Sequence, residues 1–346
     1  MAPAIQRLTI GDATREARWD AFVMACPEAT FFHRAGWQSI LHRVFRHETH
    51  FLYAEVDGRI EGVLPLARVK SLLFGHSLVS LPFAVYGGAA GSSPEVVDAL
   101  ERSAQELAQR MGVDHLELRN TTRRHADWPL QDLYVTFRKA ILPDEEANLL
   151  AIPRKQRAMV RKGIAKGLRS EVDDGVDRFF ALYASNVHRH GTPGLPKRYF
   201  EALRSQFCVD CDVQTVVGEG GQPLSSVLSF YFRDEVLPYY AGDDPMAREL
   251  AANDFKYWEL MRRACQRGLK VFDYGRSKRG SGSFAFKKNW GFEPQALHYE
   301  YCLYKRDTVP QNNPANAKYR LLIEAWRRMP IGVANWLGPI VVRNLG

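Results

Sequence analysis

Cysteines and long hydrophobic runs are both scarce in this sequence. Its 346 residues include 5 cysteines, an odd and small number, so we expect no disulfide framework and a reducing compartment. No segment has the ~18 uninterrupted apolar residues of an ordinary membrane-spanning helix. The N-terminal sequence MAPAIQRLTIGDATREARWD lacks the basic and apolar regions of a signal peptide. We therefore expect a cytoplasmic protein.

Several common catalytic signatures are missing as well. The chain has no GxSxG elbow, no Walker loop, no GxGxxG that opens a helix and no HExxH. Cys208 and Cys211 form a CxxC with His188 and His190 upstream, a spacing that zinc could use. The residues beside these cysteines are typical of a core, however, and we predict no metal site.

Acidic residues are too few to balance the basic ones. Lys and Arg number 47 against 39 Asp and Glu, and the net charge is +8. This excess favours phosphates or anionic surfaces but is too small to predict DNA binding, so no DNA partner is expected. With 46% hydrophobic and 25% charged residues, the chain is typical of a folded protein and long enough for two domains.

The order of predicted elements occurs twice. In the first half, two strands flank Asp57-Gly58, and an apolar strand, a helix over about residues 94–110 and the strand VDHLELR follow. A strand over residues 133–142 is expected to close this unit. From residue 211 the order repeats, with a helix over about 247–267 and the strand LKVFDYG. The alternative is a set of helix-glycine-strand joints such as any α+β protein contains.

We infer an internal duplication from this order. The predicted class is α/β (α+β), with two similar domains over residues 1–150 and 151–308 and a helical tail over 309–346. Superposing RMGVDHLELRN on QRGLKVFDYGR sets Gly112 on Gly268 and Glu117 on Asp273.

A basic helix is predicted at the start of the second domain, in PRKQRAMVRKGIAKGL. Only Glu171 lies nearby to neutralise it, and like charges on one helical face repel each other. We predict that this helix binds phosphate or a phosphate-bearing donor, and the alternative is a solvated basic face. Its cations are Arg154, Lys155, Arg157, Arg161, Lys162 and Lys166.

The segment with the highest concentration of candidate catalytic residues is GRSKRGSGSFAFKKNWGF. The preceding strand delivers Asp273, and glycines with cations suit a phosphate or a developing oxyanion at a strand end. The alternative is a flexible basic loop. Tyr199, Tyr239 and Tyr240 could hydrogen-bond a substrate or pack in a core. The apolar C-terminal segment, with Trp336 near several arginines, suits a membrane interface or docking onto the protein.

Together these segments resemble the Fem-type (FemAB-like) aminoacyl and peptidyl transferases, whose fold is two tandem copies of the Gcn5-related N-acetyltransferase unit. The shared segments are FFHRAGWQSI, LPFAVYGG, PRKQRAMVRKGIAKGL, YYAGDD, NDFKYWELMRRACQRGLKVFDYG and FKKNWGF. ACPEATFFHRAGW, PRKQRAMVRKG and GSFAFKKNWGFEP are most similar to the subgroup associated with exosortase and PEP-CTERM systems.

The resemblance implies acyl or aminoacyl transfer to an amine of a cell-envelope, peptidoglycan or exopolysaccharide precursor. It implies that Lys287 is catalytic. Asp273 or Glu117 could remove the proton of the amine, and substrate-assisted or water-relayed proton loss is the alternative. Arg157 and Arg161 match basic positions of the family's interdomain helix. The predicted substrate-binding residues are Tyr240, Tyr199, Asn253, Arg276 and Lys288.

The donor and partners are expected from the same resemblance. No tightly bound cofactor is expected, and the donor is acyl-CoA or aminoacyl-tRNA. Leu195 stands where the family has an Arg four residues before Tyr199, which argues against a nucleotide-muramyl-peptide acceptor. Some relatives insert a long helical hairpin after the basic helix. This sequence has no such insertion, which argues against a tRNA-borne donor without excluding it. The alternatives are a coenzyme A-dependent N-acetyltransferase acting on an amino sugar, and a non-catalytic binding module. We expect the tail either to contact the inner membrane peripherally or to dock onto the protein.

Overall fold

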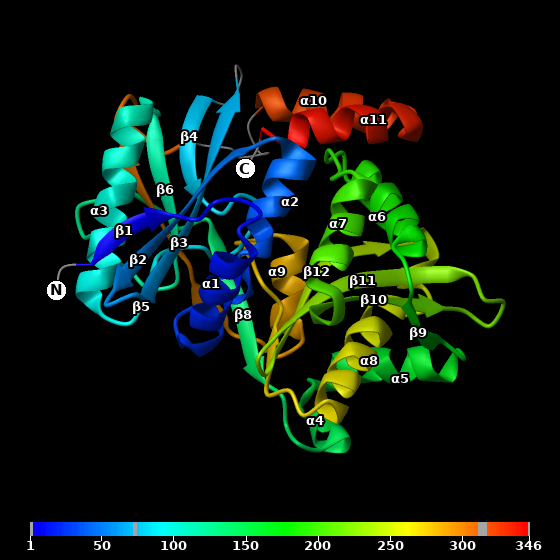
Figure 1. The fold of residues 1–346 in the computed structure, drawn as a ribbon. Coiled ribbons are helices and arrows are strands. Elements are labelled where there is room, and N and C mark those ends of the chain that lie inside the picture. Colours follow the sequence, from blue (N-terminus) through cyan, green and yellow to red (C-terminus); the bar gives the residue numbers. More distant parts are fainter. Residues whose placement is uncertain (1–2, 72–74, 311–316, 345–346) are drawn as a thin grey trace. The chain divides into compact units, whose positions relative to one another are not determined.

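The computed structural model describes residues 3–71, 75–310 and 317–344. It separates into two compact units (Figure 1). Unit 1 comprises residues 1–134, 296–311 and 343–346, and unit 2 comprises residues 135–295 and 312–342. Within the described residues, no helix has the length and apolarity that crossing a bilayer would require.

Unit 1 is a mixed sheet covered by helices on both faces. Successive residues of β2 point to opposite sides, so Phe51 stacks on Trp19 of α1 while Leu52 packs toward α3. The sheet order is β1-β2-β3-β4-β6-β16-β7, with β5 paired to β3. The strands are β1 (Ala4–Arg7), β2 (Glu48–Val56), β3 (Arg59–Ser71), β4 (Gly75–Ser80), β5 (Ala90–Gly91), β6 (His115–Asn120), β7 (Leu130–Gln131) and β16 (His298–Leu303), and the helices are α1 (Ala13–Ala25), α2 (Gly36–Phe45) and α3 (Pro94–Met111).

The predicted helix and hairpin of unit 1 are confirmed. Ser93 caps α3 by accepting a hydrogen bond from the Val96 amide, and Gly112 ends it with φ +60°. Asp57 and Gly58 form the turn between β2 and β3, both with positive φ. These features depend on neighbours within a few residues, which is why the sequence pattern predicts them.

Unit 2 repeats the arrangement. Helices α4, α5 and α8 lie on one face of its sheet, and α6 and α7 lie on the other (Figure 1). The sheet order is β14-β8-β13-β12-β11-β10-β9, with β15 paired to β8. The strands are β8 (Tyr134–Ala140), β9 (Arg169–Asp173), β10 (Cys211–Val217), β11 (Pro223–Phe232), β12 (Glu235–Asp243), β13 (Val271–Asp273), β14 (Ser277–Lys278) and β15 (Pro294–Ala296). The helices are α4 (Glu145–Ala151), α5 (Arg154–Ala165), α6 (Asp177–Arg189), α7 (Lys197–Phe207), α8 (Ala252–Gln266), α9 (Gly282–Asn289), α10 (Ala317–Arg328) and α11 (Ile331–Val342).

The prediction that a strand over residues 133–142 closes the first unit is wrong. That strand, β8, pairs antiparallel with β13 of unit 2, with Arg138 opposite Asp273. In unit 1 the place beside β6 is taken by β16, which pairs from His298↔Asn120 to Leu303↔His115. Val135 and Phe137 of β8 are fully buried in the core of unit 2, so the burial of these side chains explains the pairing. The compact units are therefore discontinuous, whereas the predicted limits 1–150, 151–308 and 309–346 are continuous.

Candidate active site

The candidate site begins where two parallel strands of unit 2 stop pairing. In the described residues, β12 and β13 pair only at Glu235↔Val271 and Val236↔Phe272, while β12 continues to Asp243. A bulge in β12 opposite Leu228 and Ser229 leaves Tyr239 as an extra residue. Carboxyl ends of parallel strands are where α/β sheets place ligands, so this region can receive a substrate.

Two predicted substrate-binding tyrosines meet beside this bulge. Tyr199 of α7 and Tyr240 of β12 hydrogen-bond each other through their hydroxyls at 3.0 Å. Burial raises the pKa of both well above the usual value. Both hydroxyls are therefore protonated near neutral pH. The nearby Tyr183 hydroxyl accepts a hydrogen bond from the Leu195 amide at 3.2 Å, and burial raises the Tyr183 pKa to about 12.

Lys287 holds the loop that follows β13. Its Nζ donates to the carbonyl oxygens of Tyr274 (2.7 Å), Gly275 (3.0 Å) and Arg276 (3.2 Å). Burial lowers its pKa to about 7, partly offset by the attraction of Asp273. An ammonium has three N–H donors, and these carbonyls engage all of them. Lys287 therefore fixes the backbone over residues 274–276.

Asp273 is fully buried and engaged by several donors. Its Oδ2 accepts from Arg138 Nη1 at 2.8 Å, and its Oδ1 accepts from the Gly275 amide at 2.7 Å. Arg138 also binds Glu235, whose pKa burial raises. The duplicated position in unit 1 is similar, because Glu117 pairs with Arg119 at 2.8 Å. Both carboxylates thus accept a hydrogen bond from an arginine.

The basic helix α5 presents most of its cations to solvent. Its buried side packs on α8, where a Cβ on Gly163 would meet Phe255 at 2.8 Å. Arg157 is half-buried and donates to the Leu150 carbonyl at 2.8 Å, so it ties α5 to α4. Among the described residues, no ion pair is assigned to the exposed members of the set, which are Arg154, Lys155, Arg161, Lys162 and Lys166.

The other predicted residues are dispersed around this region. Asn253 is half-buried near the start of α8, and Arg276 is half-buried in the loop that Lys287 holds. Lys288 is exposed. Residue patterns did not indicate Arg138 or Tyr183, because their contacts join segments far apart in sequence. Arg138 reaches the site because β8 pairs with β13 in the sheet of unit 2. The sequence pattern assigned this strand to the first unit and so did not indicate Arg138.

Among the described residues, no group of three potential metal ligands occurs at the CxxC or elsewhere. Cys208 is exposed and Cys211 is buried in β10, where burial raises its pKa. His188 donates through Nε2 to the Met329 carbonyl at 2.8 Å. These contacts explain the residues as parts of the fold.

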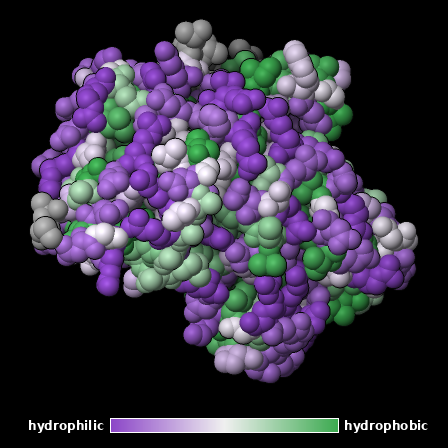
Figure 2. Space-filling model, in the orientation of Figure 1, coloured by the Kyte–Doolittle hydropathy of each residue, from purple (hydrophilic) through white to green (hydrophobic). Residues whose placement is uncertain are grey.

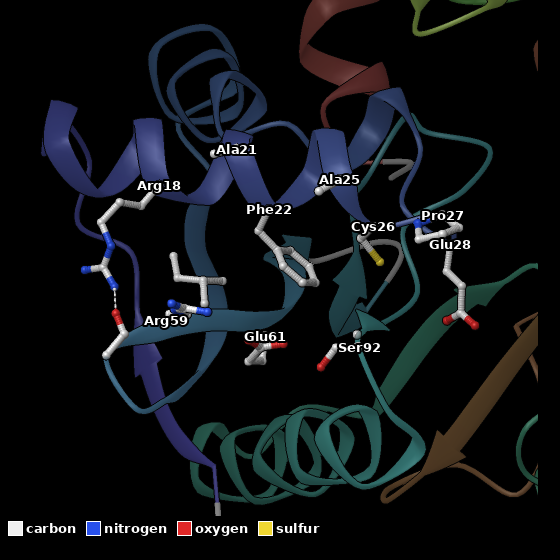
Figure 3. Close-up of a pocket in the computed structure, with 13 residues that line it drawn as sticks. Arg18, Ala21, Phe22, Ala25, Cys26, Pro27, Glu28, Arg59, Glu61 and Ser92 are labelled. Carbon is white, nitrogen blue, oxygen red and sulfur yellow. Dashed lines mark hydrogen bonds between the residues drawn. The ribbon is translucent and has the colours of Figure 1, made fainter.

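Described residues of unit 1 line two pockets. One, of about 140 Å³, lies past the parallel pair β4 and β6 and is lined by Tyr86, Gly87, Gly88 and Arg119 among others. The other, of about 770 Å³, lies between α1 and the β2–β3 turn (Figure 3). There Arg18 donates to the Gly58 carbonyl at 2.7 Å. None of the predicted site residues lines either pocket.

Residues 154–288 match the sequence family described as an acetyltransferase (GNAT) domain. This segment is therefore similar to GNAT-type acetyltransferase domains. It spans the basic helix, the paired tyrosines and Lys287. No curated protein has a sequence that matches the chain.

Solved structures show that the fold extends over both units. FemX is 15% identical, with a TM-score of 0.65 over 87% of this chain and 98% of its own. The C-terminal domain of a proposed lysylphosphatidylglycerol synthetase from Agrobacterium fabrum is 15% identical, with a TM-score of 0.57 over 83% and 92%. A tandem GNAT protein from the clavulanic acid biosynthesis pathway is 11% identical, with a TM-score of 0.56 over 89% and 100%. The predicted fold of two tandem GNAT-like domains is thereby confirmed.

Proposed function

We propose that the protein is an N-acyltransferase that transfers an acyl or aminoacyl group to an amine of a cell-envelope, peptidoglycan or exopolysaccharide precursor. The observation that carries the proposal is the Tyr199–Tyr240 hydroxyl pair beside the β12 bulge, inside the GNAT-type domain. The names of FemX and the lysylphosphatidylglycerol synthetase support aminoacyl transfer in envelope biosynthesis. Membership of the exosortase and PEP-CTERM-associated subgroup is part of the proposal and rests on the shared segments.

The chemistry needs few groups from the protein. A neutral amine attacks the carbonyl carbon of a thioester or aminoacyl ester, a C–N bond forms, and the C–S or C–O bond breaks. The leaving thiolate or alkoxide takes the proton that the amine gives up. Because the hydroxyls of Tyr199 and Tyr240 stay protonated, they can donate hydrogen bonds to the acceptor or to the leaving atom. No covalent intermediate on the enzyme is required.

Lys287 and Asp273 act on this reaction through the loop after β13. Lys287 donates to three carbonyls and so positions the backbone of residues 274–276 beside the end of β13. For direct contact with an oxyanion, its Nζ would exchange one of these carbonyls for the substrate oxygen. Asp273 is the alternative base, and its Oδ2 accepts a hydrogen bond from Arg138.

The donor is proposed to be phosphate-bearing, either acyl-CoA or aminoacyl-tRNA. Exposed cations on α5 without carboxylate partners attract phosphates, since nothing nearby neutralises them. This role belongs to Arg154, Lys155, Arg161 and Lys162, with Arg157 as a structural neighbour. Asn253, Arg276 and Lys288 remain proposed contacts to the acceptor.

The test compares substitutions of two neighbouring tyrosines of β12, Tyr240 and Tyr239. Purified protein is supplied with acyl-CoA or aminoacyl-tRNA and with an amino sugar or peptide amine, and N-acylated product is measured by mass spectrometry. Tyr240→Phe removes a hydroxyl that meets Tyr199, so we expect turnover to fall by about 10-fold or more, with a slightly lower melting temperature because the fully buried Tyr199 loses this hydrogen bond. Tyr239→Phe, whose ring packs on Phe230, is the matched control and should retain activity. Equal activity in the two variants would remove the tyrosine pair from the mechanism.

Two other functions remain as alternatives. The acetyltransferase name of the matched family favours a coenzyme A-dependent N-acetyltransferase acting on an amino sugar. In that case acetyl-CoA alone would support product formation. A non-catalytic binding module would bind donor or precursor without forming product in any combination.

A further inference from the structure

The C-terminal helix α11 is fixed on unit 2 by its small residues. Ala334, Gly338 and Val342 recur every four residues and are buried, so they share one side of the helix. A Cβ on Gly338 would meet the carbonyl oxygen of Gly194 at 2.9 Å. This close approach of two backbones leaves no room for a larger side chain at residue 338.

The opposite side of α11 is apolar and exposed. Val333, Trp336 and Ile340 are 43%, 70% and 53% exposed, and their i, i+3, i+7 spacing puts them on one face. We call these three residues the apolar face of α11. The sequence from 331 to 342 contains no charged residue. Figure 2 shows hydrophobic and pale residues over the region that α10 and α11 occupy in Figure 1.

Cations flank this face. Arg327 and Arg328 occupy the last turn of α10 and are exposed, and Arg343 follows α11 in the sequence. Arg327 reaches the His190 carbonyl only at 3.4 Å, and Arg328 lies 3.8 Å from the exposed Glu324. Such surface contacts are weak, so both guanidinium groups remain available to anions.

We propose that the apolar face of α11 and the flanking arginines bind the surface of an anionic lipid bilayer. Tryptophan and aliphatic side chains enter the boundary between headgroups and acyl chains, while arginines bind lipid phosphates. At 12 residues, α11 is about 18 Å long, which suits a helix lying in the interface rather than crossing it. A second copy of this chain fits less well, because a two-fold contact would bring the arginines of two positively charged copies together.

Vesicle co-sedimentation tests the proposal without any acyl donor, so its outcome is separate from that of the proposed function. The native chain is mixed with phosphatidylcholine vesicles with and without phosphatidylglycerol. We expect binding to the vesicles that contain phosphatidylglycerol, weakened by salt. Trp336→Ser combined with Ile340→Ser should reduce the partition coefficient by about 10-fold or more. Arg327→Gln combined with Arg328→Gln should weaken only the binding that depends on anionic lipid.

The matched control removes equally exposed apolar side chains elsewhere in unit 2. Val209 and Met246 are 82% and 53% exposed, and their double substitution by Ser should leave vesicle binding unchanged. All these side chains are exposed, so melting temperatures should also be unchanged. Absence of binding by the native chain, or equal loss in the control, would overturn the proposal. A native dimer that the Trp336→Ser and Ile340→Ser variant converts to a monomer would assign the face to a second copy instead.

Discussion

Lys287 places an ammonium group where water cannot solvate it. The carbonyls of residues 274–276 replace part of the lost hydration, but burial still lowers the pKa to about 7. The neighbouring Lys288 is exposed and pays no such cost. Two adjacent residues of one type therefore differ in environment, although both stand in the same FKKNWGF segment.

This difference predicts a pH-dependent stability. Between about pH 7 and pH 9 the unfolded chain, with an ordinary Lys pKa near 10.5, binds a proton at Lys287 that the folded chain has lost. The free energy of unfolding contributed by Lys287 therefore rises with pH in this window, and it is lowest below pH 7. Urea unfolding at a series of pH values should show this rise in the native protein and in Lys288→Met.

Lys287→Met should abolish the rise, because the titrating group is gone. It should also lower turnover by about 10² to 10³, since the loop over residues 274–276 loses its donor. The carbonyls of residues 274–276 lose this donor, so we expect the variant to be less stable than Lys288→Met. A pH profile identical in Lys287→Met and the native chain would show that Lys287 is ordinary and solvated.

At the scale of an element, α5 combines a packing side with a cationic side. Val160 and Gly163 are buried, and the close approach of Gly163 to Phe255 leaves no room for a larger side chain. The basic residues consequently project away from α8. Arg157 differs from the others because it binds the Leu150 carbonyl, which makes it a poor choice for testing phosphate binding alone.

We predict that Arg154→Gln combined with Arg161→Gln weakens donor binding by about 10-fold or more and reduces its salt dependence. The melting temperature should not change, because exposed substitutions cost within about 0.5 kcal/mol. Titration calorimetry with acyl-CoA and filter binding with aminoacyl-tRNA measure the two candidate donors. Arg102→Gln combined with Arg110→Gln on the exposed side of α3 provides the control of equal charge. Equal losses in both pairs would assign the effect to net charge alone.

At the scale of the whole molecule, the sheet of unit 1 includes β16 from the second half of the sequence, and the sheet of unit 2 includes β8 from the first half. Unit 1 depends on β16, where Glu300 is fully buried. Its carboxylate accepts hydrogen bonds from Asn120 Nδ2 at 2.6 Å and from the His125 amide at 2.8 Å. Without β16, Asn120 and the backbone after β6 would lose these acceptors, and the edge of β6 would be unpaired.

A fragment of residues 1–134 is therefore expected to lack a cooperative thermal transition, whereas the same fragment with residues 296–310 joined by a flexible linker should regain one. Circular dichroism melts and limited proteolysis compare the two. Appending the same segment with Glu300→Ala should restore folding only partly, because the acceptors for Asn120 and His125 are missing. Cooperative melting of residues 1–134 alone would show that unit 1 does not need β16.

Local sequence determined much of this protein by itself. The β2–β3 turn, the caps of α3 and the helical, basic character of α5 depend on interactions within a few residues, so their patterns predict them. The repeated order of strands and helices was likewise enough to indicate two tandem domains. Only the tertiary structure decided that β8 belongs to the sheet of unit 2 and β16 to the sheet of unit 1. It also decided that the Tyr199 and Tyr240 hydroxyls meet and that Lys287 donates to three carbonyls. These contacts join segments far apart in the chain, and they are selected by which sheet edges and buried polar groups still need a partner after the local elements have formed.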